Sequence, residues 1–128
     1  MCPTPWSETA AAASVLAAEG TVRSVLHRLG YRFRLHRAEL PGCPEVVLPR
    51  WRLALFIVDC GRHPHPDCTR PVGALPPAEV GIESRRLEQV GAALERQGWQ
   101  TLIVQACDAD DLEALGYRLD IALRGRLV

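Results

Sequence analysis

The spacing of apolar side chains predicts three helices along the chain. Residues 7–29 form an Ala-rich stretch whose larger apolar side chains recur on one helical face, and Gly30 follows as a stop signal. This stretch predicts one helix, or two helices broken at Gly20. The same periodicity returns in residues 80–94 and 110–123, so we expect two further amphipathic helices there.

Four other segments have the alternation and composition of β-strands. Three of them lie between the first and second helices, and the fourth lies between the second and third. The second and third strands are separated by a hairpin turn at Pro49-Arg50. The resulting order, α-β-β-β-α-β-α, predicts an α/β fold with a mixed sheet flanked by helices. The expected strands are residues 31–36, 45–48, 52–58 and 99–106.

Metal-binding side chains are concentrated directly after the third expected strand, and one more thiol ends the fourth. Zn²⁺ takes four tetrahedral ligands from thiolates and imidazoles. Five candidates are present, so at least one of them is not a zinc ligand and could have another role. An odd cysteine count of five favours thiols and metal over a disulfide framework, with a Cys60–Cys68 disulfide as the alternative. The candidates are Cys60, His63, His65, Cys68 and Cys107.

Composition narrows the classes of partner. The length of 128 residues and 48% hydrophobic content suit one domain with its own core. Formal net charge is zero, and every basic residue is Arg, which can bind phosphate in a bidentate way but offers no amine for Schiff-base chemistry. Neutrality argues against strong nonspecific binding to DNA. With neither a signal peptide nor an apolar run long enough to span a bilayer, we expect a cytoplasmic protein without membrane contact.

Four stretches together carry a resemblance to a known family: residues 26–36, Leu-Pro-Gly-Cys-Pro-Glu-Val-Val-Leu-Pro at 40–49, the Cys60 to Cys68 run, and Gly98-Trp99 with Leu102-Ile103-Val104 and Cys107. They resemble the very short patch repair (Vsr) endonucleases, which nick DNA beside a T:G mismatch. The resemblance implies a restriction-endonuclease-like core, Mg²⁺-dependent cleavage and double-stranded DNA, mismatched or not, as the partner. It also implies an endonuclease-fold domain over residues 15–128, after an amino-terminal arm of residues 1–14.

Residue roles follow from the resemblance position by position. The family's structural zinc ligands fall on Cys60, His65, Cys68 and Cys107. His63 then corresponds to the histidine beside the scissile phosphate, a catalytic acid or base, although a loop histidine that only packs is the alternative.

The carboxylates of the family site also have counterparts. Glu45 stands where the family has its Mg²⁺-binding aspartate, and Glu19 corresponds to an acidic residue of the first helix that supports the active site. Asp59 has no family counterpart and could form a second metal-binding carboxylate with Glu45, unless it is only a solvated acid.

The chain also departs from the family pattern. Ile57 and Val58 replace a threonine and a histidine near the metal, and Gly61-Arg62 replaces an aromatic pair that wedges between base pairs. Two functions therefore remain open. One is a Vsr-like endonuclease with impaired or lost activity. The other is a zinc-stabilised pseudo-nuclease that serves as a DNA-binding or protein-interaction module.

If DNA is bound, five arginines are candidates for phosphate contact, with solvated surface arginine as the alternative for each. The Ala-rich residues 9–18 could instead pack against a protein partner. The candidate arginines are Arg32, Arg34, Arg62, Arg85 and Arg86.

Overall fold

A computed structural model describes residues 10–58, 60, 68 and 77–124. Its elements follow the predicted order, and the first helix continues unbroken through Gly20. Two short 3₁₀ helices, η1 and η2, follow β2 and β4 and were not predicted. The elements are α1 (Ala10–Arg28), β1 (Arg34–Leu35), β2 (Val46–Leu48), η1 (Pro49–Trp51), β3 (Leu53–Val58), α2 (Pro77–Arg96), β4 (Gln100–Gln105), η2 (Ala106–Asp110) and α3 (Leu112–Arg124).

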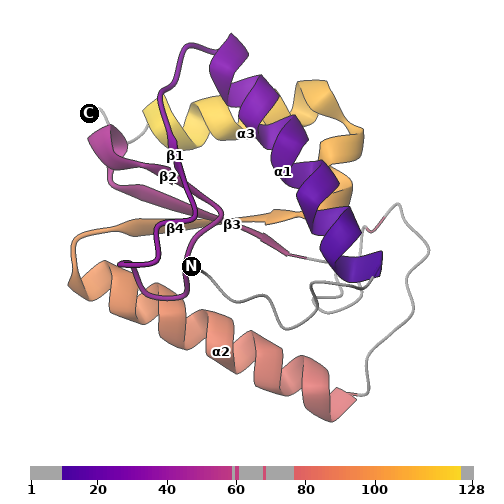
Figure 1. The fold of residues 1–128 in the computed structure, drawn as a ribbon, viewed down its shortest axis with the longest axis vertical. Helices are drawn as coiled ribbons and strands as arrows, with labels where there is room; N and C mark the ends of the chain where they lie inside the picture. Colours follow the sequence, from indigo (N-terminus) through magenta and orange to yellow (C-terminus); the bar gives the residue numbers. More distant parts are fainter. Residues whose placement is uncertain (1–9, 59, 61–67, 69–76, 125–128) are drawn as a thin grey trace.

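The strands form one mixed sheet in the order β1-β2-β3-β4. β2 pairs antiparallel with β1 and β3, whereas β3 and β4 are parallel because α2 carries the chain back to the starting end of the sheet. Helices α1 and α3 cover one face and α2 covers the other (Figure 1). The predicted mixed sheet flanked by helices is thus confirmed. None of the described helices is long and apolar enough to cross a membrane.

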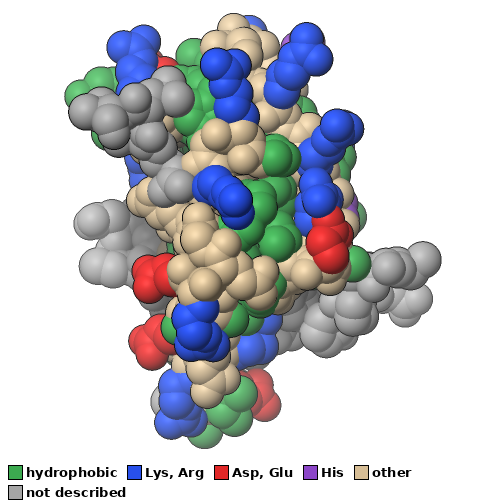
Figure 2. Space-filling view, turned by 90° about the vertical axis from the view of Figure 1, so that its left-hand side faces the viewer, with side chains coloured by type: hydrophobic (Ala, Val, Ile, Leu, Met, Phe, Trp, Pro, Cys, Tyr) green, Lys and Arg blue, Asp and Glu red, His purple; other side chains and the backbone are tan. Residues whose placement is uncertain are grey.

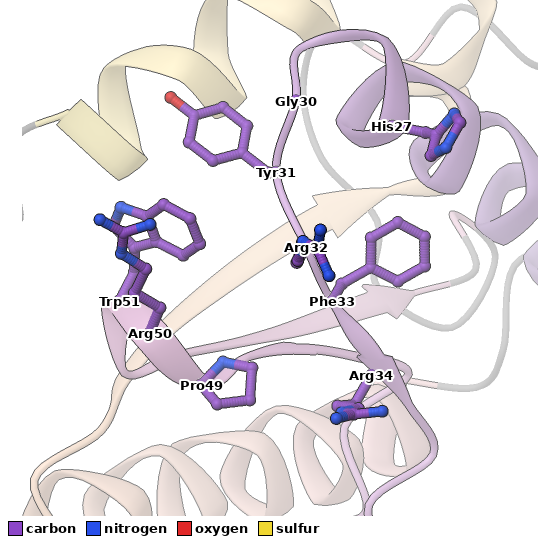
Figure 3. A pocket seen from close by; sticks show the side chains of 9 residues that line it. All are labelled: His27, Gly30, Tyr31, Arg32, Phe33, Arg34, Pro49, Arg50 and Trp51. Atoms are coloured by element: carbon purple, nitrogen blue, oxygen red, sulfur yellow. The ribbon is translucent and has the colours of Figure 1, made fainter.

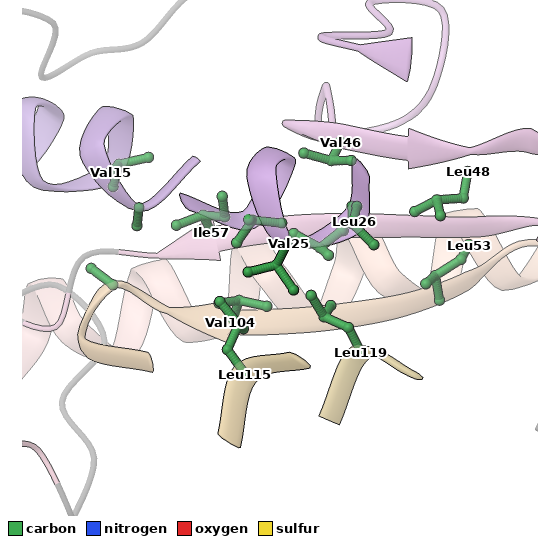
Figure 4. Packing of buried hydrophobic residues seen from close by; sticks show 14 of the residues in the cluster. Val15, Val25, Leu26, Val46, Leu48, Leu53, Ile57, Val104, Leu115 and Leu119 are labelled. Carbon is green, nitrogen blue, oxygen red and sulfur yellow. The ribbon is translucent and has the colours of Figure 1, made fainter. Parts of the chain in front are cut away.

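Strand β3 lies at the centre of the sheet, and all six of its residues are buried. Because successive side chains point to opposite faces, Leu53, Leu55 and Ile57 pack in the larger core beneath α1 and α3, while Ala54 and Phe56 pack against the α2 side. Figure 4 shows the larger core between these two helices and the sheet. A continuous apolar run is therefore explained by burial on both faces.

Helix α1 ends where the sequence places its glycine. Gly30 has φ 86°, and its N–H donates to the His27 carbonyl at 3.1 Å, while Tyr31 N–H donates to the Leu26 carbonyl at 3.0 Å. This pair of bonds is the Schellman motif, which satisfies helix-end carbonyls through a left-handed residue. The motif directs the chain from α1 into the segment that leads to β1.

The first strand is shorter than expected, because β1 covers two residues rather than 31–36. His36 has φ 49°, a left-handed conformation that turns the backbone out of the extended path. β1 also lies at the sheet edge and pairs only with β2.

Helix α3 starts two residues later than expected. Asp111 caps this helix by accepting a hydrogen bond from Ala114 N–H at 3.1 Å.

The turn before β2 allows no side chain at Gly42. This residue has φ 73°, and a Cβ there would lie 2.5 Å from Val90 Cγ1 on α2. We expect Gly42→Ala to lower the free energy of unfolding by about 2–4 kcal/mol, from backbone strain and overpacking together. Urea denaturation would measure it.

Gly20→Ala is the matched control for Gly42→Ala. No atom lies within 4 Å of a Cβ built at Gly20, which sits inside α1. The control should therefore raise stability by about 0.5–1 kcal/mol, because alanine favours the helix over glycine. Equal stability of the two variants would show that α2 does not pack closely on this turn.

Candidate functional site

Glu45 directly precedes β2 and brings a carboxylate to the end of β3. The β2–β3 register pairs Val46 with Leu55, so Glu45 lies near the last residues of β3. Its Oε2 accepts a hydrogen bond from the Ile57 N–H at 3.1 Å. The half-buried side chain is thereby held by backbone, and it forms no salt bridge with the part of the chain that the structure describes.

A second carboxylate reaches the same place from α1. Glu19 is only 4% exposed, the one charged side chain among the buried residues that the structure describes. Burial raises the pKa of Glu45 to about 7, and the negative charge of Glu19 adds to the rise, while the Ile57 N–H and the positive charge of Arg86 oppose it. The structure therefore brings together two of the expected catalytic residues, Glu19 and Glu45.

His36 joins this carboxylate pair. Its Nε2 lies 2.7 Å from Glu19 Oε1, and its backbone N–H donates to the Glu45 carbonyl at 3.2 Å. The residue was not among the sequence candidates. In the sequence it stands at the end of an alternating, strand-like run. Its place in the site depends on the left-handed turn of its backbone, which hydrophobic periodicity does not reveal.

Ile57 and Val58 end β3 beside the carboxylates. Their side chains are 2% and 6% exposed, and Ile57 belongs to the core under α1. Neither can coordinate a cation or move a proton. The polar groups of this end therefore come from other elements, namely α1, the turn after β1 and the start of β2.

Three thiols converge at the carboxyl ends of the parallel strands. The Sγ atoms of Cys60, Cys68 and Cys107 all lie within 4.8 Å of one another. Cys60 follows β3 and Cys107 lies in η2 after β4, so the parallel register places them together. All three are free thiols, which rules out the alternative of a Cys60–Cys68 disulfide.

The donor set of this cluster suits zinc. Tetrahedral zinc with Zn–S bonds of about 2.3 Å holds its sulfurs roughly 3.8 Å apart. This separation is compatible with three Sγ atoms that lie within 4.8 Å of one another. Burial, first of all, raises the pKa of Cys60 to about 12, and hydrogen bonds with the neighbouring thiols contribute. Such a group ionises readily only when a cation is bound beside it, as a zinc thiolate is.

Four of the sequence candidates lie outside the described residues. They are Asp59, Arg62, His63 and His65. The expected fourth zinc ligand and the expected catalytic histidine are both among them, and their roles stay predictions.

The candidate arginines separate into two groups. Arg32 and Arg34 line a cavity of about 720 Å³ together with Arg50, which the sequence reasoning missed (Figure 3). Arg85 and Arg86 are exposed on α2, and Arg86 is paired with Glu83 at 3.4 Å while its charge also acts on Glu45. The four candidate arginines that the structure describes therefore do not form one surface.

Comparison with known proteins adds a family and two relatives. A family model described as "DNA mismatch endonuclease Vsr" matches residues 9–70. The chain is 43% identical over 108 residues to the "Type II nicking enzyme V.XorIIP" of Xanthomonas oryzae pv. oryzae, covering 79% of the chain and 77% of the relative. It is 31% identical over 115 residues to the "DNA mismatch endonuclease Vsr" of Escherichia coli (strain K12), covering 87% and 72%.

Proposed function

Because the chain belongs to the family of Vsr DNA mismatch endonucleases, we propose that it nicks one strand of double-stranded DNA in a Mg²⁺-dependent reaction. The observation that carries the proposal is the pairing of the buried Glu19 with the half-buried Glu45 at the end of β3. The charges of the two carboxylates repel each other, as the raised pKa of Glu45 reflects, and a hard divalent cation with oxygen ligands relieves such repulsion.

The residues of the pair have distinct roles in this proposal. Glu45, held by the Ile57 N–H, supplies the metal ligand, and Glu19 adds charge and positions His36. Among the described residues, His36 supplies the imidazole at this site. Its Nε2 is placed to hold or move a proton. A bound Mg²⁺ would polarise the scissile phosphate and activate water. His63 and Asp59 remain further candidates by resemblance.

Zinc has a separate, structural role in the proposal. Cys60, Cys68 and Cys107 would hold it, with His65 as the fourth ligand by resemblance. The ion would join the ends of β3 and β4 and so fix the edge of the sheet that carries Glu45. The restriction-endonuclease-like core expected from the sequence agrees with the mixed sheet and its flanking helices.

The test is a nicking assay on purified protein. We expect a labelled duplex with a single T:G mismatch to be cut on one strand when Mg²⁺ is present, and to stay intact in Mg²⁺-free buffer. A matched duplex tests whether the mismatch is required. Glu19→Gln should lower the rate by about 100-fold or more, the size of losing one preorganised charged group.

Glu88→Gln, an exposed carboxylate change on α2, is the matched control and should keep full activity. The proposal fails if no duplex is nicked and no Mg²⁺ or Mn²⁺ binds while zinc content and folding are intact.

A second function is favoured by one observation. Ile57 and Val58 place buried apolar side chains at the strand end where the resemblance implies a threonine and a histidine. A protein that has lost those groups could keep its fold and its DNA contacts without cleavage. Binding of duplex DNA without nicking, and unchanged by Glu45→Gln, would support this binding module over the enzyme.

A further inference from the structure

The cavity beside β1 lies away from the carboxylate pair. It is formed by the end of α1, the segment leading into β1 and the η1 turn between β2 and β3. Glu45 precedes β2, whereas η1 follows it. Three strand residues at about 3.3 Å each separate these positions by roughly 10–15 Å along the hairpin. The cavity is therefore a distinct place on the fold.

Uncompensated positive charge surrounds this cavity. Arg32, Arg34 and Arg50 line it with His27, and no Asp or Glu is among its described lining residues. None of the three arginines forms an ion pair with a described residue; Arg50 instead lies over the Trp51 ring, 5.4 Å from its centroid. In a chain of zero net charge, such a concentration of guanidinium groups favours an anionic ligand.

The carboxylate next to the cavity does not neutralise these arginines. Tyr31 Oη donates to Asp120 Oδ1 at 2.9 Å, and Asp120 Oδ2 is paired with Arg124 Nε at 2.9 Å. The charge of Asp120 is therefore already balanced within α3. On the face drawn in Figure 2, basic side chains (blue) gather around a hydrophobic patch (green) in the upper half, where acidic side chains (red) are few.

Aromatic side chains form a second part of the cavity lining. Tyr31, Phe33 and Trp51 line it, which is three of the seven aromatic residues in the chain. Tyr31 and Trp51 meet edge to face at 5.0 Å, so their rings are held in place. Phe33 is half-buried and follows Arg32 in the alternating run, and Figure 3 shows its ring on the opposite side of the segment from the Tyr31 ring.

We infer that this cavity binds an unpaired nucleotide of single-stranded DNA, with its phosphate on the arginines and its base against the aromatic wall. Sites for single strands combine a positive groove with aromatic rings, because unstacked bases expose faces that a duplex hides. The volume of about 720 Å³ lies within the range of small-ligand sites. The site goes beyond strand cleavage and needs neither Glu45 nor Mg²⁺.

The test uses fluorescence anisotropy of a labelled oligothymidylate in Mg²⁺-free buffer, so that failure to nick DNA has no bearing on it. We expect the double variant Arg32→Ala/Arg34→Ala to weaken binding by about 10-fold or more. The slope of log affinity against log salt should also fall by about 0.7 for each lost contact. Arg96→Ala, an exposed arginine in the last turn of α2, is the matched control and should bind as the unchanged protein does.

A base contact needs its own arm. Phe33→Leu should weaken binding of the oligothymidylate several-fold but leave binding of an abasic strand of equal length unchanged. Melting curves would confirm that all variants fold. The inference is overturned if the double variant and Arg96→Ala bind equally, or if a duplex binds as tightly as the single strand and loses the same factor.

Discussion

Glu45→Gln should abolish nicking while leaving the fold at least as stable as before. The amide oxygen of glutamine can still accept the Ile57 N–H bond, so the packing at the end of β3 is kept. The negative charge is lost, and with it the proposed ligand for the divalent cation. We expect the nicking rate to fall by at least about 100-fold and the binding of Mn²⁺, followed by paramagnetic resonance, to be lost.

The same variant has a pH signature in protein without divalent cations. The folded-state pKa of Glu45, about 7, lies above its ordinary value of 4.5, so the folded state binds more protons between these values. Stability of the unchanged protein therefore falls as pH rises from about 4.5 to 7, by up to about 3 kcal/mol from this group. Glu45→Gln lacks this loss, and its advantage should grow with pH and level off above about 7.

Urea denaturation of both proteins across this pH range measures the difference. If Glu45→Gln still nicked DNA, Glu45 would not be the ligand of the divalent cation. If the difference in unfolding free energy between the two proteins did not change with pH, burial would not raise the pKa of Glu45 in the folded state. Because the variant is compared with its parent at each pH, other titrating groups cancel if they do not contact Glu45.

Cys107→Ser should have the largest effect on folding. Removing one thiol breaks the proposed zinc site, and structural zinc contributes on the order of 10 kcal/mol to the folding of small domains. We expect zinc content to fall from near one ion per chain to almost none, and the protein to unfold at a much lower temperature or to fail to fold. Atomic emission of the purified protein and thermal melting measure these results.

Folding failure alone would not identify zinc, so a second measurement is needed on the unchanged protein. A zinc-specific chelator should expose the three clustered thiols to alkylation by iodoacetamide, and mass spectrometry would locate the new labels. Added Zn²⁺ should restore protection. Protein that contains no zinc yet resists alkylation equally with and without chelator would contradict the metal site, since burial alone would then explain the cluster. Ser24→Ala, an exposed change on α1, serves as the variant control.

Periodicity and turn residues were enough to predict the order of elements, because each rests on local physics. Leu53–Val58 is a continuous apolar run, which burial on both faces of the sheet explains. Gly30 ends α1 because it has no Cβ and can adopt the left-handed conformation, φ 86°, that closes the helix. The convergence of Cys60, Cys68 and Cys107 was also expected, and here the parallel β3–β4 register supplies the reason.

Contacts set by irregular backbone escaped the sequence reasoning. His36 reaches Glu19 because its backbone adopts φ 49°, a left-handed conformation that is uncommon for residues other than glycine. Arg50 joins Arg32 and Arg34 because the hairpin turn is a 3₁₀ helix that brings it beside the end of α1. Both depend on distances between segments that are separate in the sequence, and periodicity carries no information on those distances.

The single parallel pair in the sheet bears on how the chain folds. β1–β2 and β2–β3 join strands that are neighbours in sequence, but β3 meets β4 only after the whole crossover through α2 has closed. Contacts of high sequence separation form late, since the entropy of loop closure opposes them first. Cys60 and Cys107 sit at the ends of these two strands, so they meet only once that closure is complete. An ion captured there would slow unfolding more than it speeds folding.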